Sequence, residues 1–294
     1  GLGVVKKGHF GDKITIDSGG IYVLSGDSVF SGNIETTKFL KGNASLLEGI
    51  SGNGYKGIRE KINNIIKPQA KGDNSIVIGY NNIVYGSNSC ILSGANSNIT
   101  SNFSSILGGL TNKITGNFSS ILNGNLNHIN NDYAIASGYG SKSTKYGQIA
   151  HSMGYFNSVG DSQINTYIYR REIDHTTTDF YNLGINNIDP LSNINGAIQL
   201  DNSSILSYNI NLVGVSSTSN KYWNYILTGC VEKNSSGSYI HIKGSKEIIV
   251  KNKKSDDVEI DTDNTYGIYI KMKIKDEYTV RWMAKVETVE LIYV

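Results

Sequence analysis

The chain has 294 residues, of which 38% are hydrophobic, 33 are glycine and 2 are proline. This length can hold two or three modules, and the composition favours tightly turned β-structure over collagen or proline-rich linkers. The net charge of +2 gives no electrostatic case for nucleic acid as a partner. The two cysteines, Cys90 and Cys230, belong to no metal-binding spacing, which argues against a zinc site or a disulfide framework.

The N-terminal segment, residues 1–70, contains short alternating runs that predict small strands and turns. Four isoleucines near its end fall at helical spacing, and Pro68 follows them. This pattern predicts one short amphipathic helix near 57–67. The first residue is not methionine, which suggests a fragment or a processed chain.

A repeat of about fifteen residues occupies residues 71–160. Each unit has an isoleucine three residues before a glycine, and a second isoleucine about seven residues after the first. A short fixed period is typical of stacked β-coils, and fifteen residues leave room for two short strands and two turns. The predicted core of the repeat consists of Ile76, Ile91, Ile106, Ile121 and Ile135.

A two-sided coil with one large aliphatic residue per strand has a thin core and an exposed flank. A closed homotrimer along the stacking axis would bury that flank, so we expect three copies. The asparagines beside the second isoleucine can form hydrogen-bonded ladders or line an ion site on the axis. These residues are Asn82, Asn98, Asn112 and Asn127.

Residues 161–294 contain long alternating strands. Ile268, Ile270 and Met272 share one face of such a strand, and Val280 and Trp282 share one face of the last strand. We expect a C-terminal, jelly-roll-like antiparallel β-sandwich that forms a tip domain. The fold class is therefore all-β, with a trimeric β-roll or β-helix in front of the sandwich.

Two surface features suit contact with a sugar or an anionic polymer. Alternation in 221–229 puts Trp223 on one face and Tyr222 on the other, where an aromatic ring can stack on a sugar. A lysine-rich run at 251–254 can meet an anionic polymer of a cell surface. The predicted ligand contacts are Tyr222, Lys251, Lys253 and Lys254.

The fifteen-residue units resemble the head repeats of trimeric autotransporter adhesins and the repeat shafts of bacteriophage tail fibres. Segments 147–172 and 281–291 resemble a module at the distal end of phage tail-fibre proteins. The residues that match this module are Gly160, Asp161, Ser162, Gln163, Arg170, Arg281 and Trp282. The resemblance covers about 71–294.

This resemblance implies a receptor-binding tail fibre on the virion, with three sandwiches contacting a host surface glycan or surface protein. Other tail or fibre proteins are expected at its N-terminal side. One alternative is a trimeric adhesin on a bacterial cell surface, whose full gene would encode a signal peptide and a membrane anchor. The other is a tailspike that depolymerises polysaccharide.

Acidic residues are scarce in the repeat. Between Lys71 and Gly160 they are Asp73 and Asp132, at opposite ends of the stack. Glycoside hydrolysis needs two carboxylates held close together. The sequence therefore predicts no catalytic residues, no cofactor and no metal site, and a protein that is not an enzyme.

Overall fold

The computed structural model describes residues 68–175, 180–185, 189–191, 196–217, 219–251, 256–274 and 278–293. The predicted helix near 57–67 and nearly all of segment 1–70 lie outside these residues. Within them every regular element is a β-strand, which confirms the all-β prediction. No helix in this part of the chain is long and apolar enough to cross a membrane.

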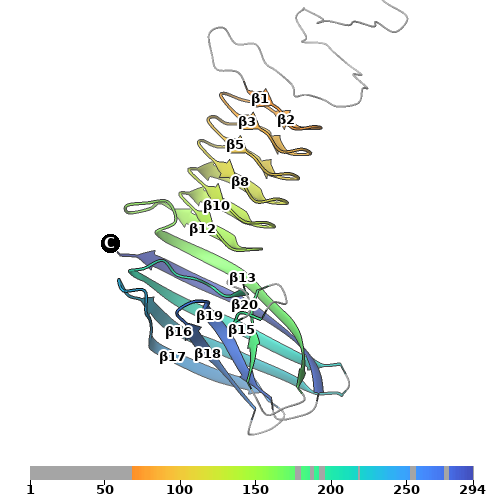
Figure 1. Ribbon diagram of the computed structural model, residues 1–294, viewed down its shortest axis with the longest axis vertical. Helices are drawn as coiled ribbons and strands as arrows, with labels where there is room; N and C mark the ends of the chain where they lie inside the picture. Colours follow the sequence, from red (N-terminus) through yellow and green to blue (C-terminus); the bar gives the residue numbers. More distant parts are fainter. Residues whose placement is uncertain are drawn as a thin grey trace, which may run out of the picture. The chain divides into compact units, whose positions relative to one another are not determined.

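Two columns of short parallel strands form a β-solenoid (Figure 1). The first column contains β1 (Gln69–Ala70), β3 (Ile83–Val84), β5 (Asn98–Ile99), β7 (Lys113–Ile114), β9 (His128–Ile129) and β11 (Lys142–Ser143). The second contains β2 (Ile76–Val77), β4 (Cys90–Ile91), β6 (Ser105–Ile106), β8 (Ser120–Asn125), β10 (Ile135–Tyr139) and β12 (Ile149–Met153). Each coil contributes one strand to each column, as the two-strand interpretation of the repeat predicts.

The core column of the solenoid differs from the predicted one at two positions. Ile91, Ile106 and Ile121 stack in line and are fully buried. Ile76 is 36% exposed and Ile135 is partly exposed, while their C-terminal neighbours Val77 and Ala136 are buried and pair with the isoleucine column.

This correction has a simple geometric cause. Val77 precedes Gly79 by two residues, whereas Ile91 precedes Gly94 by three. A glycine at this turn has positive φ, and a Cβ on Gly79 would lie 2.2 Å from the carbonyl oxygen of Gly94. The glycines therefore stay stacked, and a coil with one residue fewer moves its core position one residue towards the glycine.

The polar residues inside the solenoid form hydrogen-bonded ladders. Asn112 accepts a bond from the backbone N–H of Asn127 at 3.0 Å, and its Nδ2 donates to the carbonyl oxygen of Gly124 at 2.9 Å. Ser97 occupies the equivalent place one coil earlier, where its Oγ accepts from the N–H of Asn112. The ladder alternative is thus confirmed, although Asn98, which the sequence suggested as a member, lies one residue away from it.

Five long antiparallel strands continue the second column of the solenoid as one sheet (Figure 1). In spatial order they are β13 (Ser162–His175), β20 (Tyr278–Ile292), β15 (Ser204–Ser216), β16 (Tyr222–Lys233) and β17 (Tyr239–Val250). β12 pairs with β13, so the sheet continues from the last coil into the long strands without a break.

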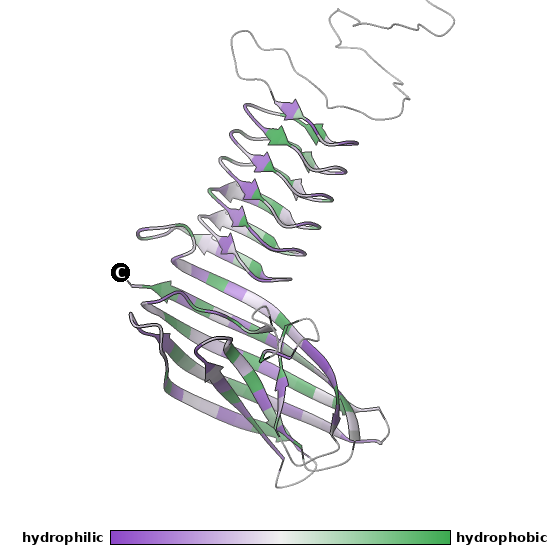
Figure 2. Ribbon diagram, viewed as in Figure 1, coloured by the Kyte–Doolittle hydropathy of each residue, from purple (hydrophilic) through white to green (hydrophobic). Residues whose placement is uncertain are grey.

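A three-stranded sheet covers the inner face of these strands. It contains β14 (Tyr181–Leu183), β19 (Gly267–Lys273) and β18 (Asp257–Asp263). The two sheets share a hydrophobic core that includes Trp223, Trp282, Ile270 and Met272, as the predicted sandwich requires. Figure 2 shows the alternation of hydrophobic and hydrophilic residues along the long strands that produces this arrangement.

The junction residues Asp161 and Gln163 have structural roles. The Asp161 carboxylate accepts bonds from the backbone N–H groups of Phe156, Asn157 and Ser158 at 2.6–2.9 Å. Gln163 accepts from the backbone N–H of Lys142 at 2.8 Å and donates to its carbonyl oxygen at 2.9 Å. These bonds fix the loop between β12 and β13 and tie the last coil to the first long strand.

Candidate functional site

The outer face of the long strands, which points away from the core, carries two rows of aligned side chains. Strand pairing brings each row together from segments that are distant in the sequence. The first row is Ile164, Val289, Ser207, Cys230 and Lys243. The second row is Glu287, Asn209, Thr228 and Ser245.

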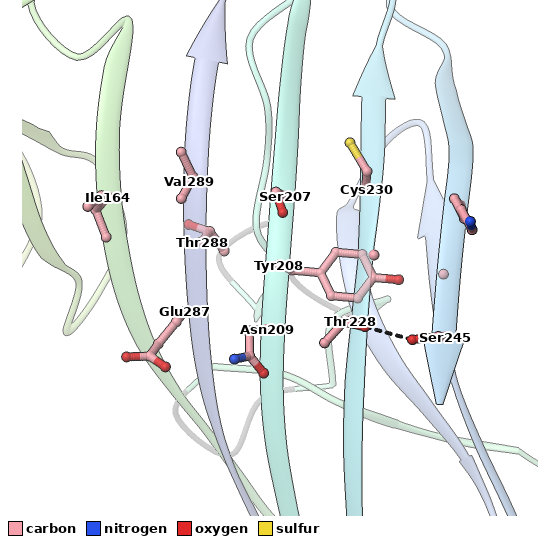
Figure 3. A pocket seen from close by; sticks show the side chains of 13 residues that line it. Ile164, Ser207, Tyr208, Asn209, Thr228, Cys230, Ser245, Glu287, Thr288 and Val289 are labelled. Carbon is pink, nitrogen blue, oxygen red and sulfur yellow. Dashed lines mark hydrogen bonds between the residues drawn. The ribbon is translucent and has the colours of Figure 1, made fainter. Parts of the chain in front are cut away.

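A trough of about 540 Å³ runs between these rows across the strands (Figure 3). The residues between the rows, Thr288, Tyr208, Gly229 and Gly244, direct their side chains or hydrogens towards the inner face. Their main chain therefore forms the floor of the trough. At about 4.8 Å per strand, five strands give a trough of roughly 19 Å, which suits an elongated ligand.

The paired glycines in the floor are explained by a tyrosine beneath them. Tyr208 pairs with Gly229, and a Cβ on Gly229 would lie 2.3 Å from the Tyr208 hydroxyl oxygen. On Gly244 the same oxygen would be 3.0 Å away. The ring fills the space that two side chains would otherwise take, and burial raises the pKa of Tyr208 to about 12, so its phenol stays neutral at physiological pH.

The second row is polar throughout. The Thr228 and Ser245 hydroxyls are 2.7 Å apart and share a hydrogen bond (Figure 3). The Glu287 carboxylate lies 2.7 Å from the Lys285 ammonium group on the same strand. Each of these groups is on the solvent side of the sheet and can exchange its bond for one to a ligand.

The first row is apolar at one end and basic at the other. Ile164 is 53% exposed and Val289 is 57% exposed. Lys243 stands at the β17 end of the row and is exposed. The trough thus offers an aliphatic contact, a line of hydroxyl and amide groups, and charges of both signs.

The residues predicted as ligand contacts lie elsewhere. Tyr222 is 58% exposed at the start of β16, and Lys251 follows the end of β17. Since Asn224 pairs with Val250, the two residues lie on neighbouring strands at one end of the sheet. Neither lines the trough. Lys253 and Lys254 lie outside the residues that the structure describes.

A partly buried carboxyl group, which no sequence pattern indicated, lies at the junction of the solenoid with the long strands. Glu290 accepts a bond from Asn165 Nδ2 at 3.3 Å, and Asn165 Oδ1 accepts bonds from Gln148 at 2.7 Å and from Gln163 at 2.9 Å. Burial, followed by the negative charge of Asp201, raises the pKa of Glu290 to about 7. This group can therefore gain or lose a proton near neutral pH.

No protein-family model and no curated protein matches this chain. Among solved structures, it matches the tailspike protein gp49 of Acinetobacter baumannii bacteriophage Fri1, a capsular polysaccharide depolymerase. The identity is 10%, the match covers 74% of this chain and 46% of that one, and the TM-score is 0.26. It also matches the tailspike protein of Acinetobacter baumannii phage AM24, with 9% identity, coverage of 75% and 54%, and a TM-score of 0.24.

The chain spans about half the length of these two solved structures. Both come from phage tails, the broad class to which the sequence resemblance pointed, but similarity at this level does not identify a function. The prediction that the chain is not an enzyme is wrong as it stands, because one of the matched structures is a depolymerase. That prediction rested on the scarcity of acidic residues in the repeat.

Proposed function

We propose that this chain is a receptor-binding protein of a bacteriophage tail and that its trough binds a saccharide of the host cell surface. The observation that carries the proposal is the lining of the trough. Sugar hydroxyls both donate and accept hydrogen bonds, and Asn209, Thr228 and Ser245 offer both functions in one line. Ile164 and Val289 complement the apolar C–H face of a sugar ring.

The architecture supports the same role. A solenoid that shares one continuous sheet with the long strands gives a stiff connection between them. In this role the chain belongs to the virion tail, with other tail or fibre proteins towards its N-terminal side. It acts as a homotrimer, so that weak saccharide contacts gain avidity from several copies.

The exposed end of the sheet near Tyr222 and Lys251 is a second place for host contact. Tyr222 lies beside Val215 across the β15–β16 pair, and both side chains are more than half exposed. An aromatic ring beside an aliphatic side chain suits stacking on a sugar or packing against a surface protein.

Binding to immobilised capsular and lipopolysaccharide O-chain preparations tests the saccharide proposal. Asn209→Ala removes an amide from the trough and is expected to weaken binding about tenfold. This factor corresponds to the free energy of one or two hydrogen bonds. Asn211→Ala is the matched control, because Asn211 is exposed on the same strand and face but lies outside the trough.

If the wild-type chain binds a polysaccharide and the two variants bind it with equal affinity, the trough is excluded as the binding site. In that case Tyr222→Ala distinguishes contact at the end of the sheet from contact elsewhere. The same preparations are assayed for new reducing ends, which separates binding alone from binding with cleavage. Failure of every preparation to bind would count against a saccharide receptor.

A further inference from the structure

The two exterior faces of the solenoid differ in chemistry. On the column that contains β4, β6 and β8, the residue after the core position is a leucine in three successive coils, and each is 43–48% exposed. These residues, Leu92, Leu107 and Leu122, are called the leucine ladder. On the opposite column the equivalent residues are Thr100, Thr115 and Asn130, all of them polar and exposed.

A second exposed apolar ladder lies at the turns that precede β6, β8 and β10. Phe103, Phe118 and Tyr133 stack with ring centroids 4.9 and 5.0 Å apart, and each is 49–54% exposed. Each has φ between 53° and 57°, a conformation that bulky residues rarely adopt. These three residues are called the aromatic ladder.

Stacking within one chain leaves about half of both ladders in contact with water. Contiguous apolar surface of this kind marks an interaction site in soluble proteins. The threonines and asparagine on the opposite column show that the repeat does not require apolar residues at exterior positions. This difference between the two faces therefore indicates that a partner covers the flank that carries the two apolar ladders.

We propose that the leucine ladder of one copy packs against the aromatic ladder of the next copy, coil for coil, in a closed ring of parallel chains. This inference rests on the homotrimer of the proposed function and assigns the surfaces that form it. The contact is heterologous, since each copy offers one ladder to each neighbour, and such contacts close into rings.

The spacing of the ladders favours a second copy over another partner. Both ladders repeat once per coil, at the strand spacing of about 4.8 Å. A partner with a different repeat would match one leucine and lose the match at the next. A parallel copy of this chain presents an apolar residue at the same rise over the three coils of each ladder.

The solution mass of the chain and two variants tests this interface. The wild-type chain is expected at three times its 32.0 kDa mass by light scattering. Leu122→Lys should reduce this to the mass of one chain, because it buries an ammonium group against aromatic rings. Asn130→Lys, in the same coil on the opposite column, should leave the trimer intact. Circular dichroism confirms that both variants stay folded.

Thiol protection gives a second measurement that needs no charged substitution. In a background of Cys90→Ser and Cys230→Ser, the thiol of Leu122→Cys should react with a bulky maleimide at least about ten times more slowly than that of Asn130→Cys, because the interface excludes the reagent. Equal rates in a trimer, or a trimer that survives Leu122→Lys, overturn the assigned surfaces.

These outcomes are separable from those of the proposed function. A wild-type monomer overturns the interface, while the comparison of Asn209→Ala with Asn211→Ala still decides whether the trough binds saccharide. A trimer dissociated by Asn130→Lys and not by Leu122→Lys overturns the assignment but retains the homotrimer. Loss of trimer in Leu122→Lys with unchanged binding per chain supports the interface.

Discussion

Replacing Glu290 with glutamine removes a titratable group from the junction between the solenoid and the long strands. Burial, with the charge of Asp201, raises the pKa of Glu290 from 4.5 to about 7, and Asn165, Lys142 and Lys145 oppose this only in part. The folded chain therefore holds a proton between these pH values that the unfolded chain has released. The resulting stability is fully present below about pH 4.5 and is lost as the pH rises through about 7.

The size of the stability change follows from the difference in pKa. A rise of about 2.5 in the pKa of Glu290, at about 1.4 kcal/mol per pKa unit, changes the free energy of unfolding by about 3 kcal/mol between the two ends of this pH window. Glutamine is neutral at every pH and keeps an oxygen that can accept the bond from Asn165. The Glu290→Gln variant should thus match the wild type at low pH and exceed its stability by up to about 3 kcal/mol at pH 8.

Urea denaturation at several values between about pH 5 and pH 8 measures this difference. Glu287→Gln is the control, since Glu287 lies three residues earlier on the same strand with its side chain 41% exposed. Its pH profile should follow that of the wild type. If the wild type and Glu290→Gln keep a constant difference across the range, the junction does not hold a proton on Glu290 and the argument fails.

Three further predictions concern the scaffold. Asn112→Ala leaves buried main-chain groups of the ladder without partners and should lower the free energy of unfolding by about 2–4 kcal/mol, whereas Asn98→Ala, one residue outside the ladder, should change it by less than about 0.5 kcal/mol in the same urea titration. A Cβ on Gly214 would lie 2.5 Å from the Trp282 ring, so Gly214→Ala should cost about 1–3 kcal/mol and change the near-ultraviolet circular dichroism; an unchanged melting temperature would contradict this packing. Asp161→Ala removes the acceptor of three backbone N–H groups, so amide exchange in 156–158 should accelerate at least about tenfold, and equal exchange by mass spectrometry would show that the loop does not depend on the carboxylate.

Much of the fold was accessible from the sequence because its determinants are local. The period of the repeat predicted the stacked coils. Alternation put Trp223 on the face opposite Tyr222 and put Trp282 on the same face as Val280, and both tryptophans are buried in the core. Ile76 and Ile135 were wrongly assigned to the core because the core position was counted back from the glycine. In these two coils the core residue is one position closer to the glycine, at Val77 and Ala136.

The trough was not accessible in the same way. It depends on the register of five strands, which brings Glu287 next to Asn209 and Asn209 next to Thr228. No spacing along the chain encodes those pairings. Gly229 and Gly244 gave a usable signal, because glycine inside a strand often marks a site where another group approaches closely. Glu290 was missed because a carboxylate at the end of an alternating strand has no sequence feature that reveals its partial burial.

The hydrogen bonds between coils point along the stacking direction, and this has a mechanical consequence. A force that pulls on the two ends of the solenoid loads every interface between coils in series. Within one interface the load is shared by main-chain bonds from both columns and by bonds such as that from Asn127 to Asn112. The weakest interface, and not the sum of all bonds, therefore sets the tension at which the stack opens.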